Sequence, residues 1–144
     1  MRTSITLRGD HAELARLHAF ADEFAQECGL PDDERSRLLI ILEELFTNAA
    51  AHGHGSDAAG GNITVALGWR TGRLRISFVD DGPPFDPLTF HEPDFAAPAE
   101  ERAIGGLGIY IVRSLVHQAR YRREGGRNRL HLVRRIDLLD GACS

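Results

Sequence analysis

Two stretches in the first third of the chain carry apolar residues at the spacing of one helix face. The first predicts a helix that opens at a capping box, Asp10 with Glu13, and ends before Gly29, a residue type favoured at helix C-caps. The second follows an acidic first turn at 32–34 and runs toward Gly53. The apolar positions are Leu14, Leu17, Ala21, Phe24 and Cys28 in the first helix, and Leu38, Ile41, Leu42, Leu45, Phe46 and Ala49 in the second.

Alternation of apolar and polar residues predicts strands in three further regions. A short β-compatible stretch lies near the start of the chain. A hairpin then turns at Thr71-Gly72, and its second strand ends at Asp80. A second hairpin is predicted around Gly125-Gly126. The expected strand segments are 3–7, 63–69, 74–78 and the two arms within 119–135.

Two segments lack periodicity. Residues 54–61 are rich in glycine and polar residues, which predicts a surface loop. Residues 83–103 are too long for a simple connector, so a functional or disordered segment is expected there. An apolar helix follows, entered through glycines at 105–108. This order of helices and hairpins predicts an α/β fold, a two-layer sandwich of a mixed, mostly antiparallel sheet with helices on one face.

Length, composition and charge narrow the class of protein. A chain of 144 residues with 42% hydrophobic residues predicts a single globular domain over 1–144. The net charge of −4 argues against a chain whose main role is direct binding of nucleic acid or of an anionic membrane. No window approaches a membrane span, and Cys28 and Cys143 form neither a disulfide framework nor a zinc site, so a cytoplasmic protein is expected.

All 17 basic residues are arginine, because the chain contains no lysine. This excludes a Walker-A lysine, a Schiff base and a lysine of the kind found in eukaryotic-type protein kinases. The glycines at 105–108 therefore do not belong to a P-loop. They also fit a Rossmann fingerprint poorly, because they follow an irregular segment instead of a strand.

Three short motifs carry candidate chemistry. Glu44 and Asn48 lie one turn apart on one helix face, where an amide oxygen can bind Mg²⁺ and a carboxylate can accept a proton. Asp80 and Gly82 end a strand, where a carboxylate can accept a hydrogen bond from an amine such as that of adenine. The glycine-rich helix start lets backbone N–H groups approach phosphate. Taken singly, each motif has an ordinary alternative: a solvated surface pair, a turn, or a helix start without a ligand.

In this order the three motifs resemble the N, G1 and G2 boxes of the GHKL ATPases, which have the Bergerat or histidine-kinase-like ATPase fold. Within that superfamily the chain is most similar to the anti-sigma-factor serine/threonine protein kinases. The similarity covers most of the chain, from the second helix to the last hairpin. It rests on Glu43 to Gly53, Asp81 to Pro87 and Gly105 to Arg113.

The resemblance implies a role for each matching residue. Asn48 would bind Mg²⁺, and Glu44 would be the catalytic base. Asp80 would bind the adenine amine, and Gly82 would leave room for the ring. Residues 86–104 would form the ATP lid, and the phosphates would be held by Gly105, Gly106, Leu107 and Gly108. Arg102 is either a phosphate ligand or lid anchor, or a solvent-exposed arginine. His52 and His54 are expected to pack and to be exposed, respectively, and not to bind a metal.

The reaction that the resemblance implies is transfer of the γ-phosphoryl group of ATP to serine or threonine on a small anti-anti-sigma (STAS-like) partner. A sigma factor or a response-regulator module is a possible further partner, and a homodimer formed through the first strand and the sheet region is expected. Two alternatives stay open. One is a nucleotide-gated binding module without kinase activity. The other is a detached catalytic domain of a sensor histidine kinase, although the chain has no room for a phosphoacceptor helix pair.

Overall fold

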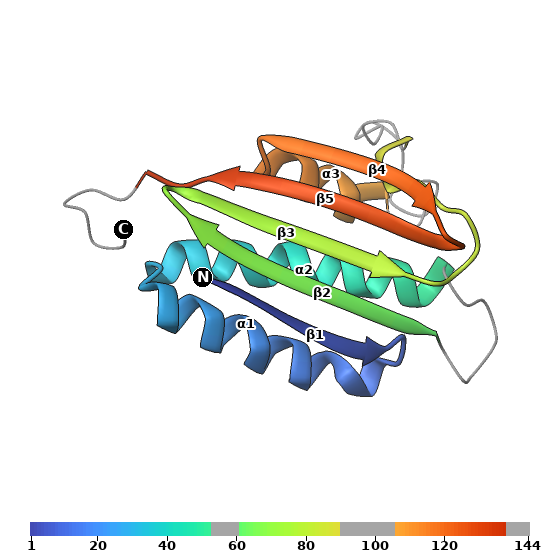
Figure 1. The fold of residues 1–144 in the computed structure, drawn as a ribbon, viewed down its shortest axis with the longest axis horizontal. Helices are drawn as coiled ribbons and strands as arrows, with labels where there is room; N and C mark the ends of the chain where they lie inside the picture. The colour runs from blue at the N-terminus through green and yellow to red at the C-terminus, as the bar shows by residue number, and fades with distance from the viewer. Residues whose placement is uncertain (53–60, 90–105, 138–144) are drawn as a thin grey trace.

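A computed structural model of the chain describes residues 1–52, 61–89 and 106–137. Five strands form one sheet in the order β1-β2-β3-β5-β4, and the helices lie on one side of it (Figure 1). All four strand pairings within these residues are antiparallel. The strands are β1 Arg2–Arg8, β2 Asn62–Arg70, β3 Arg73–Asp80, β4 Gln118–Glu124 and β5 Arg127–Arg135. The helices are α1 Leu14–Cys28, α2 Asp32–His52 and α3 Gly106–Leu115, with 3₁₀ turns η1 His11–Glu13 and η2 Pro87–Thr89.

The predicted two-layer sandwich is therefore confirmed, and its core lies between the sheet and the helices. Alternate residues of the central strands point toward the helices and are buried, as the sequence pattern predicts. Full burial of one such side chain contributes about 1.5–3 kcal/mol, so this layer supplies most of the driving force for folding. The buried strand residues include Ile63, Val65, Leu67, Trp69, Leu74, Ile76, Phe78, Leu130 and Leu132.

The start of α1 differs from the predicted capping box in one contact. Asp10 caps the 3₁₀ turn η1 by accepting a hydrogen bond from the backbone N–H of Ala12, at 3.0 Å. The Glu13 carboxylate accepts from the N–H of Arg8 at 3.1 Å, and so binds the end of β1 instead of the backbone of Asp10. The α-helix then begins one turn later than the sequence predicts. Its end is as predicted, with Gly29 in the left-handed conformation at φ 68°.

A bidentate ion pair fastens the start of α2 to the end of β5. The Arg134 guanidinium donates to both carboxylate oxygens of Glu34, from Nε at 2.8 Å and from Nη2 at 3.0 Å. Its third nitrogen, Nη1, donates to the backbone oxygen of Leu115 at the end of α3, at 2.6 Å. One arginine thus joins the start of α2 and the end of α3 to β5. Two parallel bonds to a mostly buried carboxylate are stronger than an exposed ion pair.

A second arginine supports the same helix start on the solvent side. Arg37 donates to Glu34 at 2.8 Å and to Asp33 at 3.0 Å. The hydrogen bond from Arg37 is the main reason that the pKa of the Asp33 carboxyl lies below its ordinary value. The acidic first turn that the sequence shows therefore serves two arginines as well as the helix dipole.

Several sequence predictions fall outside the described residues. They include the loop at 54–61 except for Gly61, most of the segment at 83–103, and Cys143. Of that longer segment, residues 83–89 are described and contain the short turn η2. In the part of the chain that the structure describes, no helix is long and apolar enough to span a bilayer.

Replacing Arg134 by Ala should lower the free energy of unfolding by about 2–3 kcal/mol, because Glu34 and the Leu115 carbonyl both lose a partner in a mostly buried place. Urea denaturation followed by circular dichroism measures this. The matched control is Arg135→Ala, on the next and exposed position of β5, which should change stability by less than about 0.5 kcal/mol. Equal losses in the two variants would contradict the assignment of the ion pair as the link between the layers.

Candidate functional site

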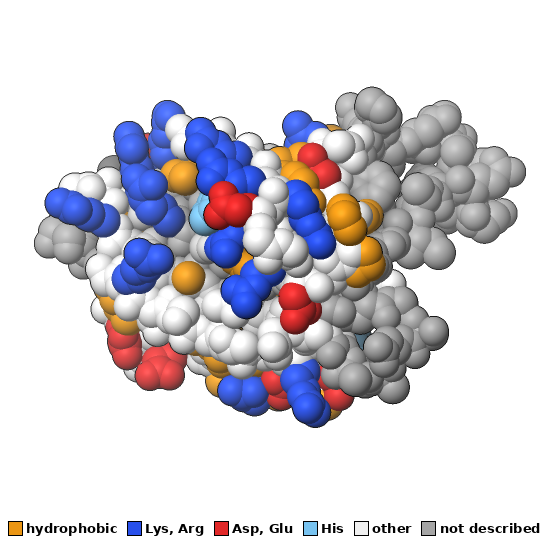
Figure 2. All heavy atoms as spheres, turned by 45° about the vertical axis from the view of Figure 1, so that its right-hand side comes forward, with side chains coloured by type: hydrophobic (Ala, Val, Ile, Leu, Met, Phe, Trp, Pro, Cys, Tyr) orange, Lys and Arg blue, Asp and Glu red, His pale blue; other side chains and the backbone are white. Residues whose placement is uncertain are grey.

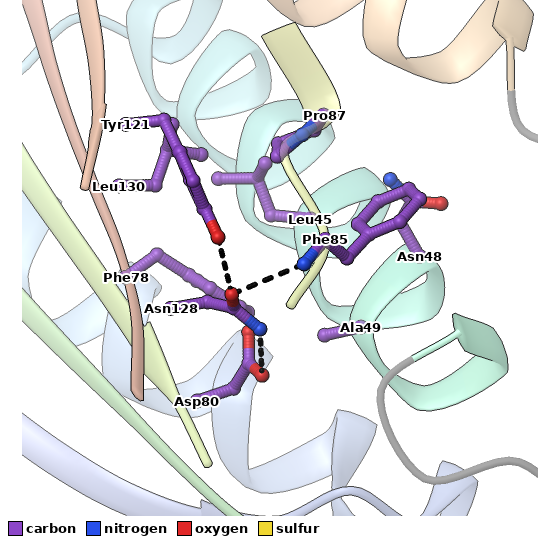
Figure 3. Close-up of a pocket in the computed structure, with 10 residues that line it drawn as sticks. All are labelled: Leu45, Asn48, Ala49, Phe78, Asp80, Phe85, Pro87, Tyr121, Asn128 and Leu130. Carbon is purple, nitrogen blue, oxygen red and sulfur yellow. Dashed lines mark hydrogen bonds between the residues drawn. The ribbon is translucent and has the colours of Figure 1, made fainter. Parts of the chain in front are cut away.

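A small cavity lies between the helix layer and the end of β3 (Figure 3). Its volume is about 30 Å³. That space holds little more than a water molecule. The side chains around it come from α2, from three strands and from the loop after β3. They are Leu45, Asn48, Ala49, Phe78, Asp80, Phe85, Pro87, Tyr121, Asn128 and Leu130. An apolar pocket with a few buried polar groups is the usual form of a small-molecule site.

Asp80 is the only carboxylate among these lining residues, and its two oxygens have different surroundings. Oδ1 accepts hydrogen bonds from the N–H of Gly82 and from Nδ2 of Asn128, each at 3.0 Å. Among the described residues, no hydrogen bond is made to Oδ2. The carboxylate is 8% exposed, so it is held rigidly by one oxygen while the other remains an acceptor for a ligand.

Asn128 is a site residue that the sequence analysis missed. It faces Asp80 across the β3–β5 pairing and is 5% exposed. Its Nδ2 also donates to the Pro83 carbonyl at 2.8 Å. Its Oδ1 accepts from the N–H of Phe85, from the Tyr121 hydroxyl and from Nη1 of Arg123. The missed signal was a polar residue at 128 on the same alternating face as Leu130 and Leu132, where an apolar residue would be expected.

Asn128 therefore fixes the loop that follows β3. Bonds to the backbone at Pro83 and Phe85 hold the two sides of the turn, and Arg123 adds a bond to the Gly82 carbonyl at 2.7 Å. The loop closes the cavity on one side, as Figure 3 shows for Phe85 and Pro87. As described, the cavity has room for a water-sized group, and a larger ligand would need its lining to change.

Asn48 reaches the same cavity from α2. The residue is 9% exposed, and its Oδ1 is buried without a hydrogen-bond partner in the described structure. A buried amide oxygen without a partner costs about 1–3 kcal/mol unless a ligand, a metal ion or water satisfies it. Within the described ranges, no group of three or more His, Cys, Asp or Glu residues is arranged to hold a metal ion. Any cation here would need ligands from a bound molecule as well as Asn48.

Glu44, one turn before Asn48, lies against the first turn of α3. A Cβ atom placed on Gly108 would collide with Oε2 of Glu44 and would be 3.0 Å from its Cδ. Real Cβ atoms do not approach other atoms so closely, so the glycine makes room for this carboxylate. The contact places Glu44 beside a helix N-terminus, where backbone N–H groups lack intrahelical partners.

The structure thus brings the predicted residues together in two groups. Asp80 and Asn48 line the cavity, the N–H of Gly82 donates to Asp80 beside it, and Glu44 lies against Gly108. Gly106 and Leu107 open α3, where a helix entered through glycines was predicted. Arg102, Gly105, His54 and residues 90–104 of the predicted lid lie outside the described residues. The functional roles of these side chains stay predictions.

The contact between Glu44 and Gly108 can be measured by a double-mutant cycle. In a Glu44→Ala background, Gly108→Ala should raise the free energy of unfolding by about 0.5–1 kcal/mol, because alanine has the higher helix propensity. With Glu44 present, the new methyl group has to displace the carboxylate, and this gain should be lost. Urea denaturation of the four proteins gives the coupling energy. An equal gain in both backgrounds would show that the two residues do not touch.

Comparison with known proteins adds a second line of evidence. The model of the histidine kinase-like ATPase domain matches residues 7–134. The serine-protein kinase RsbW of Bacillus mycoides is 27% identical over 106 residues, which cover 71% of this chain and 65% of that protein. RsbW of Bacillus anthracis is 26% identical with the same coverage. The match therefore spans less than two thirds of the length of these relatives.

Solved structures agree on the fold. The RsbU and RsbW domains of Rv1364c from Mycobacterium tuberculosis match with a TM-score of 0.67 and 22% identity, over 94% of this chain and 32% of that one. Histidine kinase AdeS of Acinetobacter baumannii matches with a TM-score of 0.51 and 14% identity, over 94% of this chain and 68% of that one. The family model, the sheet order and the helix layer together show that the chain belongs to the histidine kinase-like ATPase domain family.

Proposed function

We propose that the chain is a Mg-ATP-dependent serine/threonine protein kinase of the anti-sigma type. The observation that carries the proposal is a pair of unsatisfied oxygens at one cavity. Asn48 presents a buried amide oxygen without a partner, and Asp80 presents a carboxylate oxygen to which no described residue donates. The names of the curated relatives support phosphoryl transfer to serine.

Asp80 is proposed to bind adenine. Its free oxygen can accept from the exocyclic amine, and the apolar side chains of Phe78 and Leu130 suit the faces of a purine. A cavity of about 30 Å³ is too small for the ring, so the loop carrying Phe85 and Pro87 has to move aside on binding. Nucleotide binding would then exchange the Phe85–Asn128 hydrogen bond for contacts with the ligand.

Asn48 fits a Mg²⁺ ion, because a neutral amide oxygen is a hard ligand and this one lacks a partner in the described structure. When bound, the ion would neutralise charge on the phosphates. Glu44 is proposed to accept the proton of the attacking hydroxyl, beside the start of α3. The predicted phosphate-binding glycines at 105–108 and the predicted lid at 86–104, with Arg102, would complete the site.

The proposed phosphoacceptor is a small anti-anti-sigma (STAS-like) protein, with a sigma factor or a response-regulator module as a further partner. A cytoplasmic homodimer made of a single domain over 1–144 completes the proposal. The competing function is a nucleotide-gated binding module without transfer. Glu44 favours the kinase, since a protein that only binds has no need of a carboxylate beside the metal ligand.

Titration calorimetry with Mg-ATP tests the binding site. Asp80→Asn should weaken binding by about 10–100-fold, because an amide oriented by Asn128 replaces the charged acceptor. Asn48→Ala should remove the dependence of affinity on Mg²⁺. The matched control is Asp81→Asn, whose carboxylate accepts from the N–H of Asn62 on the exposed side and should leave affinity unchanged. Wild-type protein that binds no Mg-ATP would refute the proposal.

Transfer of radiolabelled γ-phosphate to a STAS-domain protein tests the catalytic role. Glu44→Ala should lower the transfer rate by about 10²–10⁴-fold while Mg-ATP binding persists, as expected for loss of a general base. Glu43→Ala is the control, because that carboxylate lies on the exposed side of α2. Its Oε2 is 3.2 Å from Nε2 of His18. Unchanged transfer in Glu44→Ala would exclude it as the base. Binding without any transfer by the wild type would favour the binding module.

A further inference from the structure

The side of the sheet that faces away from the helices is unusually rich in arginine. The outward-pointing positions of β3 and β5 alternate with buried ones, the pairing of β4 with β5 sets which residues of β4 share that face, and many of these positions carry guanidinium groups. Figure 2 shows these side chains in blue, gathered in the upper part of the view where Figure 1 places β4 and β5. We call this surface the arginine face and define it by Arg75, Arg120, Arg122, Arg127 and Arg129.

The positive charge on the arginine face is largely unneutralised. Glu124 forms an ion pair with Arg122 at 3.0 Å and lies 3.9 Å from Arg129. Arg75, Arg120 and Arg127 have no ion pair within the described part of the chain. The chain as a whole has a net charge of −4, so its negative charge must lie elsewhere.

Much of that negative charge lies on the helix layer. The two long helices carry eight acidic residues and three arginines. The acidic residues are Asp22, Glu23, Glu27, Asp32, Asp33, Glu34, Glu43 and Glu44, and the arginines are Arg16, Arg35 and Arg37. The two layers therefore have opposite charge, with the positive layer on the open side of the sheet.

Folding gives no reason for this arrangement. Arg122 and Arg129 lie directly opposite each other on neighbouring strands and on the same face. Like charges at such a pair of positions destabilise a sheet, and Glu124 relieves only part of the repulsion. An arrangement that costs stability points to a role outside folding, such as binding.

The shape of the surface suits a protein partner. A shallow hollow of about 220 Å³ lies beside Arg75 and His131, over the small residues Ala66, Gly68 and Ser77. A hollow with a polar and charged rim can receive a protruding side chain of a partner protein. Apart from His131, the outward positions of the described strands carry no aromatic side chain, so no extended platform for stacking nucleic-acid bases is present there.

A second copy of the chain does not fit the arginine face. A twofold interface would place the same surface on both sides and bring arginines against arginines. The neighbouring half of the open side, over β1 and β2, is different. Its middle presents Ser4, Thr6, Thr64 and Ala66, which carry no charge, while Arg2, Arg8 and Arg70 lie at its ends. The predicted self-association can use that uncharged middle and leave the arginine face open.

We propose that the arginine face docks a surface rich in Asp and Glu on a partner protein. The cavity at Asp80 lies on the other side of the sheet, so such a partner would leave the cavity uncovered. This inference does not rest on the proposed kinase activity. It assigns a second binding surface to the chain, separate from the one that would receive a phosphoacceptor.

The test uses fluorescently labelled poly-L-glutamate as the probe, with anisotropy measured at low and at high salt. The wild type should bind, and binding should weaken as salt rises. The double variant Arg75→Glu/Arg120→Glu should bind at least about tenfold more weakly, because two cations become anions. The control is Arg16→Glu/Arg35→Glu, which changes the net charge equally but on the helix layer. The affinity of this control for the probe should fall by less than about threefold.

If the double variant does not fold, the binding surface can be mapped on the wild type instead. Its amide chemical shifts are then followed by NMR while the same probe is added. The shifts should map to β3, β5 and β4. No binding by the wild type, equal loss in the control, or shifts on the helices would overturn the proposal. Tighter and equally arginine-dependent binding of a DNA oligonucleotide would identify a nucleic acid as the occupant. A dimer in sedimentation velocity that dissociates in the double variant Arg75→Glu/Arg120→Glu would identify a second copy of the chain as the occupant.

Discussion

The hydrogen bond between Asp80 and Asn128 determines the geometry of the whole site. It joins the end of β3 to β5 inside the core, where each polar side chain needs a partner. Because Asn128 also binds the backbone at Pro83 and Phe85, the same residue sets the course of the loop. The loop in turn closes the cavity that Asn48 reaches from α2. The course of this loop, and with it one wall of the cavity, depends on this one buried pair.

Much of the fold could be predicted from the sequence, because periodicity reports directly on burial. The stripes of both long helices, the alternation in β2 and β3, and Gly29 as a helix end all agree with the structure. The first turn before α1 did not follow the prediction, because Glu13 binds Arg8 across the loop. Spacing alone does not tell which of two nearby N–H groups a carboxylate will accept from.

The site was predictable only where its residues stand in a short local motif. Glu44 and Asn48 are four residues apart, and helix geometry alone places them on one face. Asn128 is 48 residues from Asp80, and only the β3–β5 register brings them together. The Glu34–Arg134 pair spans 100 residues and was missed for the same reason. Neither partner of a long-range pair has a local pattern that identifies the other.

The small size of the cavity beside Asp80 has a consequence for the timing of ligand exchange. The segment that has to move aside to admit a ligand has to move again to release it, and each opening breaks the bond between the Phe85 N–H and Asn128. Under the proposed function, one motion of this loop would gate both entry and departure of the nucleotide.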